Sequence, residues 1–154
     1  MPGEPEVLVL DTGVIGLLRF RRHKPERIAH WPSESVDRMG AAITTMSFVS
    51  RAEINAGLLA PEVDPKFAKR ERERTAAITV LPLDQPTIDE WARLHAHLRA
   101  KGVEISDNDL WIAATASSRS HPVVTCDGDL TRLADQLEVI HLPPKPDSGP
   151  PPGP

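Results

Sequence analysis

The segment "VLVLDTGVIGLL", residues 7–18, begins with four consecutive apolar residues and then reaches an aspartate. A short, uninterrupted apolar run is typical of a strand buried on both faces, so we expect a strand over Val7–Leu10. Burying even an uncharged polar group without a partner costs about 2–7 kcal/mol, and an isolated charge costs more. Asp11, at the end of this strand, therefore needs a partner that compensates for its burial.

Length and composition indicate a single soluble domain. The chain has 154 residues, 40% hydrophobic and 26% charged, which suits one domain with a substantial core. Its apolar runs are too short to span a bilayer, and no basic region precedes the first of them as in a secretory signal, so we expect no membrane partner. The single cysteine, Cys126, forms no internal disulfide, which favours a cytoplasmic location.

The C-terminal segment differs in composition from the rest of the chain. Residues 143–154, "PPKPDSGPPPGP", are rich in proline and glycine and lack the apolar residues of a packed core. We therefore expect a folded domain over residues 1–143 and a disordered tail over residues 144–154.

Short apolar runs alternate with amphipathic stretches along the remaining sequence. This alternation predicts an α/β fold with a central parallel sheet flanked by helices on both faces. Further strands are expected over Ala42–Met46 and within "ITVLPLD" (78–84), "PVVTC" (122–126) and "EVIHL" (138–142). Helices are expected from Ser47 or Ser50 to about Leu59, and within residues 61–77, 87–102, 105–118 and, as a short one, 129–136.

Two of these helices carry recognisable end signals. Thr87 and Glu90 have the spacing of a capping box, and Gly102 is expected to end the helix that they begin. Ser106 is the expected N-cap of the helix in "ISDNDLWIAATASS".

Four carboxylates lie where strands end or where the following helices begin. They are Asp11, Glu53, Asp109 and Asp127. Because the carboxyl ends of parallel strands lie at one edge of a sheet, these acids from four separate segments could converge there.

Each acid also has a purely local interpretation. Glu53 and Asp109 each follow a serine by three residues, as in a capping box, and Asp127 could begin a turn with Gly128 or cap the next helix. Asp11 could cap the helix that follows it.

Considered together, however, carboxylates within about 4–6 Å raise one another's pKa and destabilise the fold unless a cation neutralises them. An all-oxygen cluster suits Mg²⁺ or Mn²⁺, and such an ion would be the partner that Asp11 needs.

Four segments in this order and spacing resemble PIN-domain ribonucleases, above all the VapC toxins of bacterial VapBC toxin–antitoxin pairs. The segments are "VLDTGVIGLL", "SRAEINAGLL", "SDNDLWIAATA" and "VVTCDGDLTRL", and the resemblance covers nearly the whole chain before the tail. It implies a PIN-like fold and a metal-dependent endoribonuclease whose acids fall on Asp11, Glu53, Asp109 and Asp127.

Two neighbouring acids compete with this assignment. The family's third acid directly precedes the leucine of its helix, which selects Asp109 over Asp107. The segment "TCDGDL" offers both Asp127 and Asp129 as the fourth acid, and this alternative stays open.

The resemblance also implies roles and partners. Asp11 and Asp109 would be the principal ligands of Mg²⁺, with Mn²⁺ as a possible substitute, while Glu53 and Asp127 would orient the attacking water. The partners would be an RNA substrate, a VapB-like antitoxin that inserts a basic segment into the acidic site, and a second copy of the chain. The alternative is a non-catalytic PIN-like module that binds RNA or protein, but the presence of all four acids favours activity.

The formal net charge of −4 argues against a nucleic-acid partner at first sight. Without the four candidate acids, however, 18 acidic residues balance 18 basic ones. The run "RFRRHKPER" contains Arg19, Arg21, Arg22, Lys24 and Arg27 soon after the first strand. This run either contacts an RNA backbone or forms a solvated loop and helix end. The second basic run, "KFAKRERER", alternates with glutamates and is typical of a solvated helix face.

Overall fold

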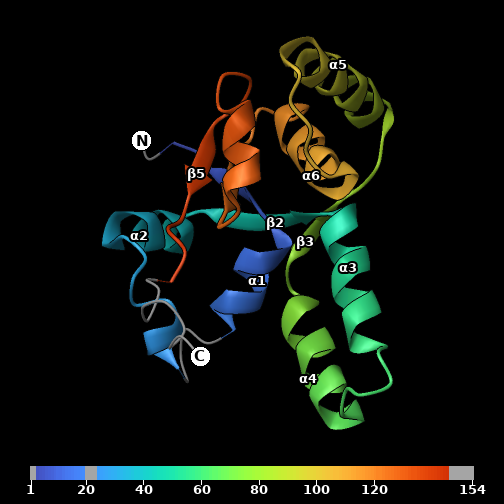
Figure 1. Ribbon diagram of the computed structural model, residues 1–154. Coiled ribbons are helices and arrows are strands. Elements are labelled where there is room, and N and C mark those ends of the chain that lie inside the picture. Colours follow the sequence, from blue (N-terminus) through green and yellow to red (C-terminus); the bar gives the residue numbers. More distant parts are fainter. Residues whose placement is uncertain (1–2, 20–23, 146–154) are drawn as a thin grey trace, which may run out of the picture.

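The computed structural model describes residues 3–19 and 24–145, and within them five strands form one fully parallel sheet (Figure 1). The order across the sheet is β3-β2-β1-β4-β5. The strands are β1 (Val7–Leu10), β2 (Ile43–Ser47), β3 (Thr79–Leu81), β4 (Val123–Thr125) and β5 (Val139–His141). The helices are α1 (Thr12–Leu18), α2 (Ser33–Ala41), α3 (Phe48–Leu58), α4 (Pro65–Thr75), α5 (Gln85–Lys101) and α6 (Asp107–Ser117), and 3-10 turns lie at η1 (Pro25–Arg27) and η2 (Gly128–Leu133).

The central position of β1 explains its uninterrupted apolar sequence. It pairs with β2 on one side and with β4 on the other. Because successive side chains of a strand point to opposite faces, Val9 packs into one core while Leu8 and Leu10 pack into the other. All three side chains are buried, as expected for a strand covered on both faces.

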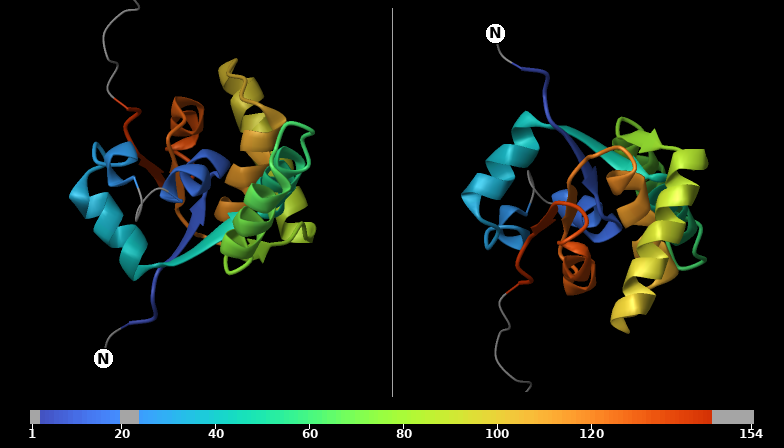
Figure 2. Two further views of the ribbon diagram at one scale, coloured as in Figure 1. Left: turned by 90° about the horizontal axis from the view of Figure 1, so that it is seen from below. Right: turned by 90° about the horizontal axis from the view of Figure 1, so that it is seen from above.

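Helices cover both faces of the sheet, as predicted (Figure 2). One core contains buried residues of α5, α6 and the η2 turn, including Leu94, Ile112 and Leu133. The other contains residues of α1 and α2, including Ile15 and Met39. The predicted α/β fold with a central parallel sheet is therefore confirmed.

The structure corrects several predicted element boundaries. Strand β2 begins at Ile43 rather than Ala42, and of the two candidate serines it is Ser47 that caps α3, by accepting a hydrogen bond from the Val49 N–H at 3.3 Å. The predicted capping box of Thr87 and Glu90 is wrong.

Helix α5 begins earlier than predicted because Asp84 is the better cap. The Asp84 carboxylate accepts from the Thr87 N–H at 3.0 Å, and Pro86 fits the first helical turn because a proline needs no N–H partner there. Glu90 instead pairs with Arg93 and accepts a hydrogen bond from the Ser117 hydroxyl at 2.7 Å.

Helix α2 has no counterpart among the predicted elements. It is a polar helix whose only buried side chain is Met39, and Gly40 lies in its last turn. Val36 and Met39, three residues apart, form its apolar side, and this pair is too short a pattern to predict the helix from the sequence. Residues 146–154, most of the expected tail, lie outside the described residues. No helix within residues 3–19 and 24–145 has both the length and the apolar character needed to cross a membrane.

Two residues that follow helices have a positive φ angle, Gly102 at 66° and Ser120 at 56°. A left-handed conformation costs a non-glycine residue about 1–2 kcal/mol. Ser120→Gly should therefore raise the free energy of unfolding by about 1 kcal/mol. Gly102→Ala should lower it by a similar amount, although an added Cβ meets no atom within 4 Å. Urea denaturation measures both changes, and a stabilising Gly102→Ala would contradict the argument.

Candidate active site

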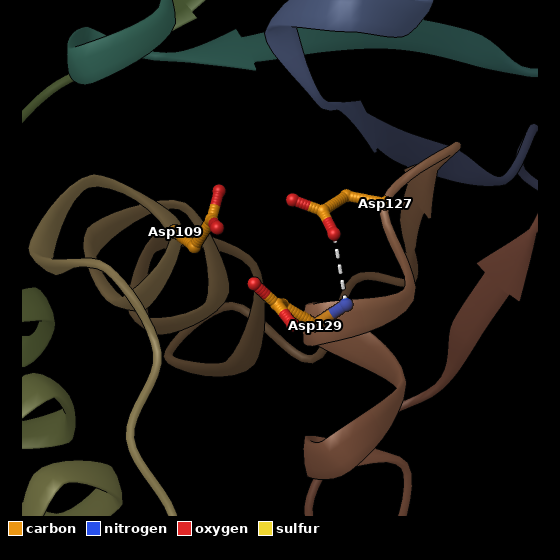
Figure 3. A group of neighbouring side chains, drawn as sticks. All are labelled: Asp109, Asp127 and Asp129. Atoms are coloured by element: carbon orange, nitrogen blue, oxygen red, sulfur yellow. Dashed lines mark hydrogen bonds between the residues drawn. The ribbon is translucent and has the colours of Figure 1, made fainter.

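Three aspartates meet beside the carboxyl end of the sheet (Figure 3). Asp109 belongs to the first turn of α6, while Asp127 and Asp129 belong to the segment that follows β4. Each offers a carboxylate oxygen, and these oxygens all lie within 4.8 Å of one another. The Asp127 carboxylate also accepts a hydrogen bond from the Asp129 N–H at 2.9 Å. Both candidates for the fourth acid are thus brought to the same place.

Asp11 is the most buried of the predicted acids, with 8% of its surface exposed. Its Oδ1 accepts from the Thr12 N–H and its Oδ2 from the Thr125 hydroxyl, both at 2.7 Å. Burial nevertheless raises the pKa of Asp11, and the charges of Asp127 and Glu53 add to the increase. Asp11 therefore caps α1 and interacts with the other acids through its charge, although it is not one of the three aspartates whose oxygens lie within 4.8 Å of one another. Its two hydrogen bonds compensate for only part of the cost of its burial.

Asp109 experiences the combined charge of the cluster. Burial raises the pKa of its carboxyl to about 6, against a hydrogen bond from Ser106 that lowers it. The charges of Asp11, Asp127 and Asp129 contribute to this increase after burial. The Ser106 hydroxyl accepts from the Asp109 N–H at 3.2 Å, so the predicted N-cap of α6 is confirmed. A carboxylate with this pKa is crowded by like charges and favours a neutralising cation.

Glu53 lies on α3 and is joined to α1 rather than to the three aspartates. Its Oε1 accepts from the Thr12 hydroxyl at 3.0 Å, and Thr12 Oγ1 lies 2.9 Å from the buried Ser50 Oγ. The local interpretation of Glu53 as part of a capping box with Ser50 is wrong, because α3 begins at Phe48 and Ser50 lies inside it. Glu53 acts on Asp11 through its charge.

Thr125 connects two of the acids. Its fully buried hydroxyl donates to Asp11 and accepts from the Asp127 N–H at 2.9 Å.

Thr125→Val keeps the shape but removes both hydrogen bonds, so we expect the free energy of unfolding to fall by about 1–2 kcal/mol. Thr125→Ser keeps the hydroxyl and should lose only about 1 kcal/mol, for one methyl group. Urea denaturation in EDTA measures both losses, and an unchanged free energy of unfolding in Thr125→Val would show that the hydroxyl contributes nothing.

Arg132, which motif analysis did not single out, also contacts the site. Its Nη2 lies 3.9 Å from Asp129 Oδ1, three residues earlier on η2. The i,i+3 spacing of these opposite charges was the available signal in the sequence.

Of the predicted basic run, Arg21 and Arg22 lie outside the described residues. Arg19 lines a cavity of about 260 Å³ together with Thr12 and Glu53, at the edge of the site.

The donor atoms fit a hard divalent cation. Every candidate ligand in the group of three aspartates is a carboxylate oxygen, the donor that Mg²⁺ and Mn²⁺ prefer. Burial first, and then the charges of the neighbouring acids, raise the pKa values of Asp11 and Asp109, so a bound cation would relieve the cost of ionising both. The arrangement can therefore hold a cation against a phosphate group and an attacking water.

Comparisons with known proteins agree with this geometry. The family model described as PIN domain matches residues 8–136. Ribonuclease VapC5 of Mycobacterium tuberculosis is 34% identical over 146 residues, which cover 92% of this chain and 100% of that protein.

Solved structures show the same similarity. The crystal structure of VapBC-5 from Mycobacterium tuberculosis, a member of the VapBC family of toxin-antitoxin systems, contains a similar chain with a TM-score of 0.67. The two chains are 30% identical, and the match covers 89% of this chain and 99% of that chain. A chain of FitAcB from Neisseria gonorrhoeae has a TM-score of 0.67 and 26% identity, covering 87% of this chain and 96% of that one. The described fold, the acids at its edge and the match over residues 8–136 lead to one conclusion: this chain belongs to the PIN domain family, within which it is similar to the VapC ribonucleases.

Proposed function

We propose that this PIN domain is the toxin of a type II toxin–antitoxin pair and that it cleaves RNA as a metal-dependent endoribonuclease. The observation that carries the proposal is the meeting of Asp109, Asp127 and Asp129 beside the buried Asp11. This cluster lies in a chain that is similar over its length to a protein named a ribonuclease. The alternative of a non-catalytic binding module is not favoured, because such a module has no need for mutually repelling carboxylates.

The acids have distinct roles in this proposal. Asp11 and Asp109 are the principal ligands of Mg²⁺ or Mn²⁺, and Asp127 or Asp129 completes the carboxylate set. Each Asp11 oxygen accepts one hydrogen bond, which leaves a lone pair on each for this purpose. When bound, the divalent ion supplies charge neutralisation for the phosphate oxygens and a more acidic attacking water.

The remaining residues position the reacting groups. Thr125 holds the Asp11 carboxylate, and Thr12 holds Glu53, which orients the attacking water. The water adds to phosphorus as the bond from phosphorus to the 3′ oxygen breaks. The products are therefore a 5′-phosphate and a 3′-hydroxyl.

Metal removal tests this function directly. Labelled RNAs incubated with the protein should be cleaved in Mg²⁺ or Mn²⁺, should stay intact in EDTA, and should be cleaved again when Mg²⁺ exceeds the chelator. Analysis of the ends should find 5′-phosphates. Cleavage that persists in EDTA, or products with cyclic phosphate ends, would contradict the metal mechanism. Sequencing the 5′ ends that arise when the protein is induced in cells identifies the RNA.

An antitoxin partner follows from the same similarity. The solved VapBC-5 structure, to which this chain is similar, is a member of the VapBC family of toxin-antitoxin systems. We propose that a VapB-like antitoxin places a basic segment among the acids, which attract it electrostatically. Addition of the purified antitoxin should suppress cleavage.

We also propose a homodimer. The exposed apolar side chains of Val80, Leu83 and Ile88 gather at the edge strand β3 and the start of α5. Apolar side chains beside an unpaired strand edge are typical of an interface. Light scattering measures the mass of the protein in solution.

A further inference from the structure

Two cavities are lined by residues of the loop between α5 and α6. The larger, of about 540 Å³, is lined by Arg99, Gly102, Val103, Glu104 and Arg132. The smaller, of about 410 Å³, is lined by His95, Leu98, Arg99, Val103, Glu104, Ile105, Asp107 and Leu110. Three residues line both cavities, so the two adjoin one another across the loop. Their sizes fall within the range of about 300–1,000 Å³ that is usual for small-ligand sites.

The larger cavity reaches the edge of the aspartate cluster, because Arg132 lines it and is also the ion-pair partner of Asp129. The smaller cavity adjoins the larger one and extends to Asp107 at the start of α6. A ligand that extends from the cluster along this loop therefore passes Arg132 and enters the larger cavity first.

The charges at this position suit a phosphate. The aspartates alone repel a polyanion, so the affinity for RNA must come from cations around them. Arg132 is half-exposed, and its Nη1 is fixed by the Glu104 carbonyl oxygen at 3.0 Å, which leaves further N–H groups of the guanidinium for a ligand. Arg99 is exposed and lines both cavities. Glu104 lines both cavities and Asp107 lines only the smaller one, so the larger cavity has two arginines against one carboxylate and is the place for the phosphate.

The wall of the smaller cavity suits a base. It contains apolar atoms of Leu98, Val103 and Ile105. His95 lines the cavity as well, and its ring stacks on Trp91 with the ring centroids 4.9 Å apart. Bases of single-stranded RNA bind by stacking on flat or apolar side chains while the backbone contacts arginines.

We propose that these adjoining cavities form a subsite for the RNA nucleotide next to the cleaved bond, with Arg99 and Arg132 contacting its phosphate. The proposal rests on the proposed function, because it supplies the ribonuclease with a contact beside its metal-binding acids. It assigns to Arg132 a contact with the substrate in addition to its contact with Asp129.

RNA binding by matched charge variants tests the subsite. The binding of a fluorescein-labelled single-stranded RNA is followed by fluorescence anisotropy, with Asp11→Asn in Mg²⁺ as the parent protein. Arg99→Gln and Arg132→Gln should each raise the Kd about tenfold. Each should also reduce the slope of log K against log salt by about 0.7, the loss of one phosphate contact. Arg132→Lys keeps the charge and should keep most of the slope.

The matched control is Arg70→Gln, which removes an exposed arginine of α4 and should leave the Kd unchanged. An equal loss of affinity in this control would reveal diffuse attraction and overturn the proposal. Among RNAs with a single abasic nucleotide at successive positions beside the cleavage site, one should bind several-fold more weakly. If none of them binds more weakly, the part of the proposal that concerns the base is wrong.

The two proposals fail in different ways. If the unsubstituted protein cleaves RNA while Arg99→Gln and Arg132→Gln bind it with the parent's Kd, the subsite is wrong and the nuclease stands. If the variants lose affinity as expected but the unsubstituted protein does not cleave RNA in Mg²⁺, the two arginines bind RNA and the nuclease function is wrong. Slower cleavage by Arg132→Gln at an unchanged Kd would assign this residue to holding Asp129 alone and would overturn the subsite.

Discussion

Asp11→Asn is expected to lower the rate of RNA cleavage by at least about 100-fold. The substitution keeps the size of the side chain but removes a negative charge from the centre of the site. It also breaks a hydrogen bond, because the Thr12 N–H and the Thr125 hydroxyl both donate to Asp11. An amide has one oxygen acceptor, so only one of these donors keeps its partner in the usual geometry.

The measurement is the single-turnover cleavage rate in Mg²⁺ at saturating protein. The matched control is Asp37→Asn, which makes the same chemical change at an exposed position of α2 and should leave the rate unchanged. Near-ultraviolet circular dichroism establishes that both variants are folded. Cleavage by a folded Asp11→Asn at a rate close to that of the unsubstituted protein would remove Asp11 from the site.

Asp109→Asn is expected to have opposite effects on activity and stability. It should reduce cleavage to a similar extent, and in metal-free buffer at neutral pH it should make the protein more stable. Burial and neighbouring charges raise the pKa of Asp109 from 3.8 to about 6, so the folded protein holds this proton more tightly than the unfolded chain. Deprotonation therefore costs stability, and asparagine avoids that cost.

The size of the gain follows from the exposure of the side chain. A shift of this size in a fully buried group would correspond to about 3 kcal/mol, but Asp109 is only partly buried, and screening by solvent reduces the expected gain to about 1 kcal/mol. For a domain of this length that is an increase of about 2–4 °C in Tm.

The stability gained by Asp109→Asn depends on pH. The cost of the ionised Asp109 is present above about pH 6 and disappears below pH 3.8, so the advantage of Asp109→Asn should shrink as the pH falls through this window. Thermal unfolding in EDTA between pH 4 and 8 measures it. With saturating Mg²⁺ the order should reverse, because the unsubstituted protein gains the free energy of metal binding.

Asp107→Asn, in the same turn of α6, is the control for stability. Acids in the first turn of a helix stabilise it by about 0.3–1 kcal/mol, so this variant should be slightly less stable at neutral pH. If Asp109→Asn also lowers the Tm in EDTA, the Asp109 carboxylate acts mainly as part of the cap of α6 and the crowding argument is wrong.

Local sequence determines much of this protein. The apolar run before Asp11 is sufficient to predict a central strand buried on both faces, because only such a strand needs no polar side. Ser106 and Gly102 begin and end helices as predicted, because a hydroxyl acceptor and a tolerance for positive φ are properties of single residues.

Tertiary structure decides the rest. Thr87 and Glu90 have the spacing of a cap, but Asp84 competes successfully for the same N–H group, and Glu90 finds partners on its own helix and on α6. Helix α2 packs Met39 and, in part, Val36 against the core beside the sheet, and this pair is too short a pattern to predict a helix.

The site divides in the same way. The sequence alone determines which acids follow strands and begin helices, since the order of elements fixes the edge at which they emerge. The sequence leaves Asp127 and Asp129 as alternatives, whereas the structure brings both within 4.8 Å of Asp109. Distances between side chains of β1, α6 and η2 depend on how the parallel strands and their helices pack together. Packing also determines the raised pKa of Asp11 and the contact of Arg132 with the α5–α6 loop, because burial and charge act between segments that are far apart in the chain.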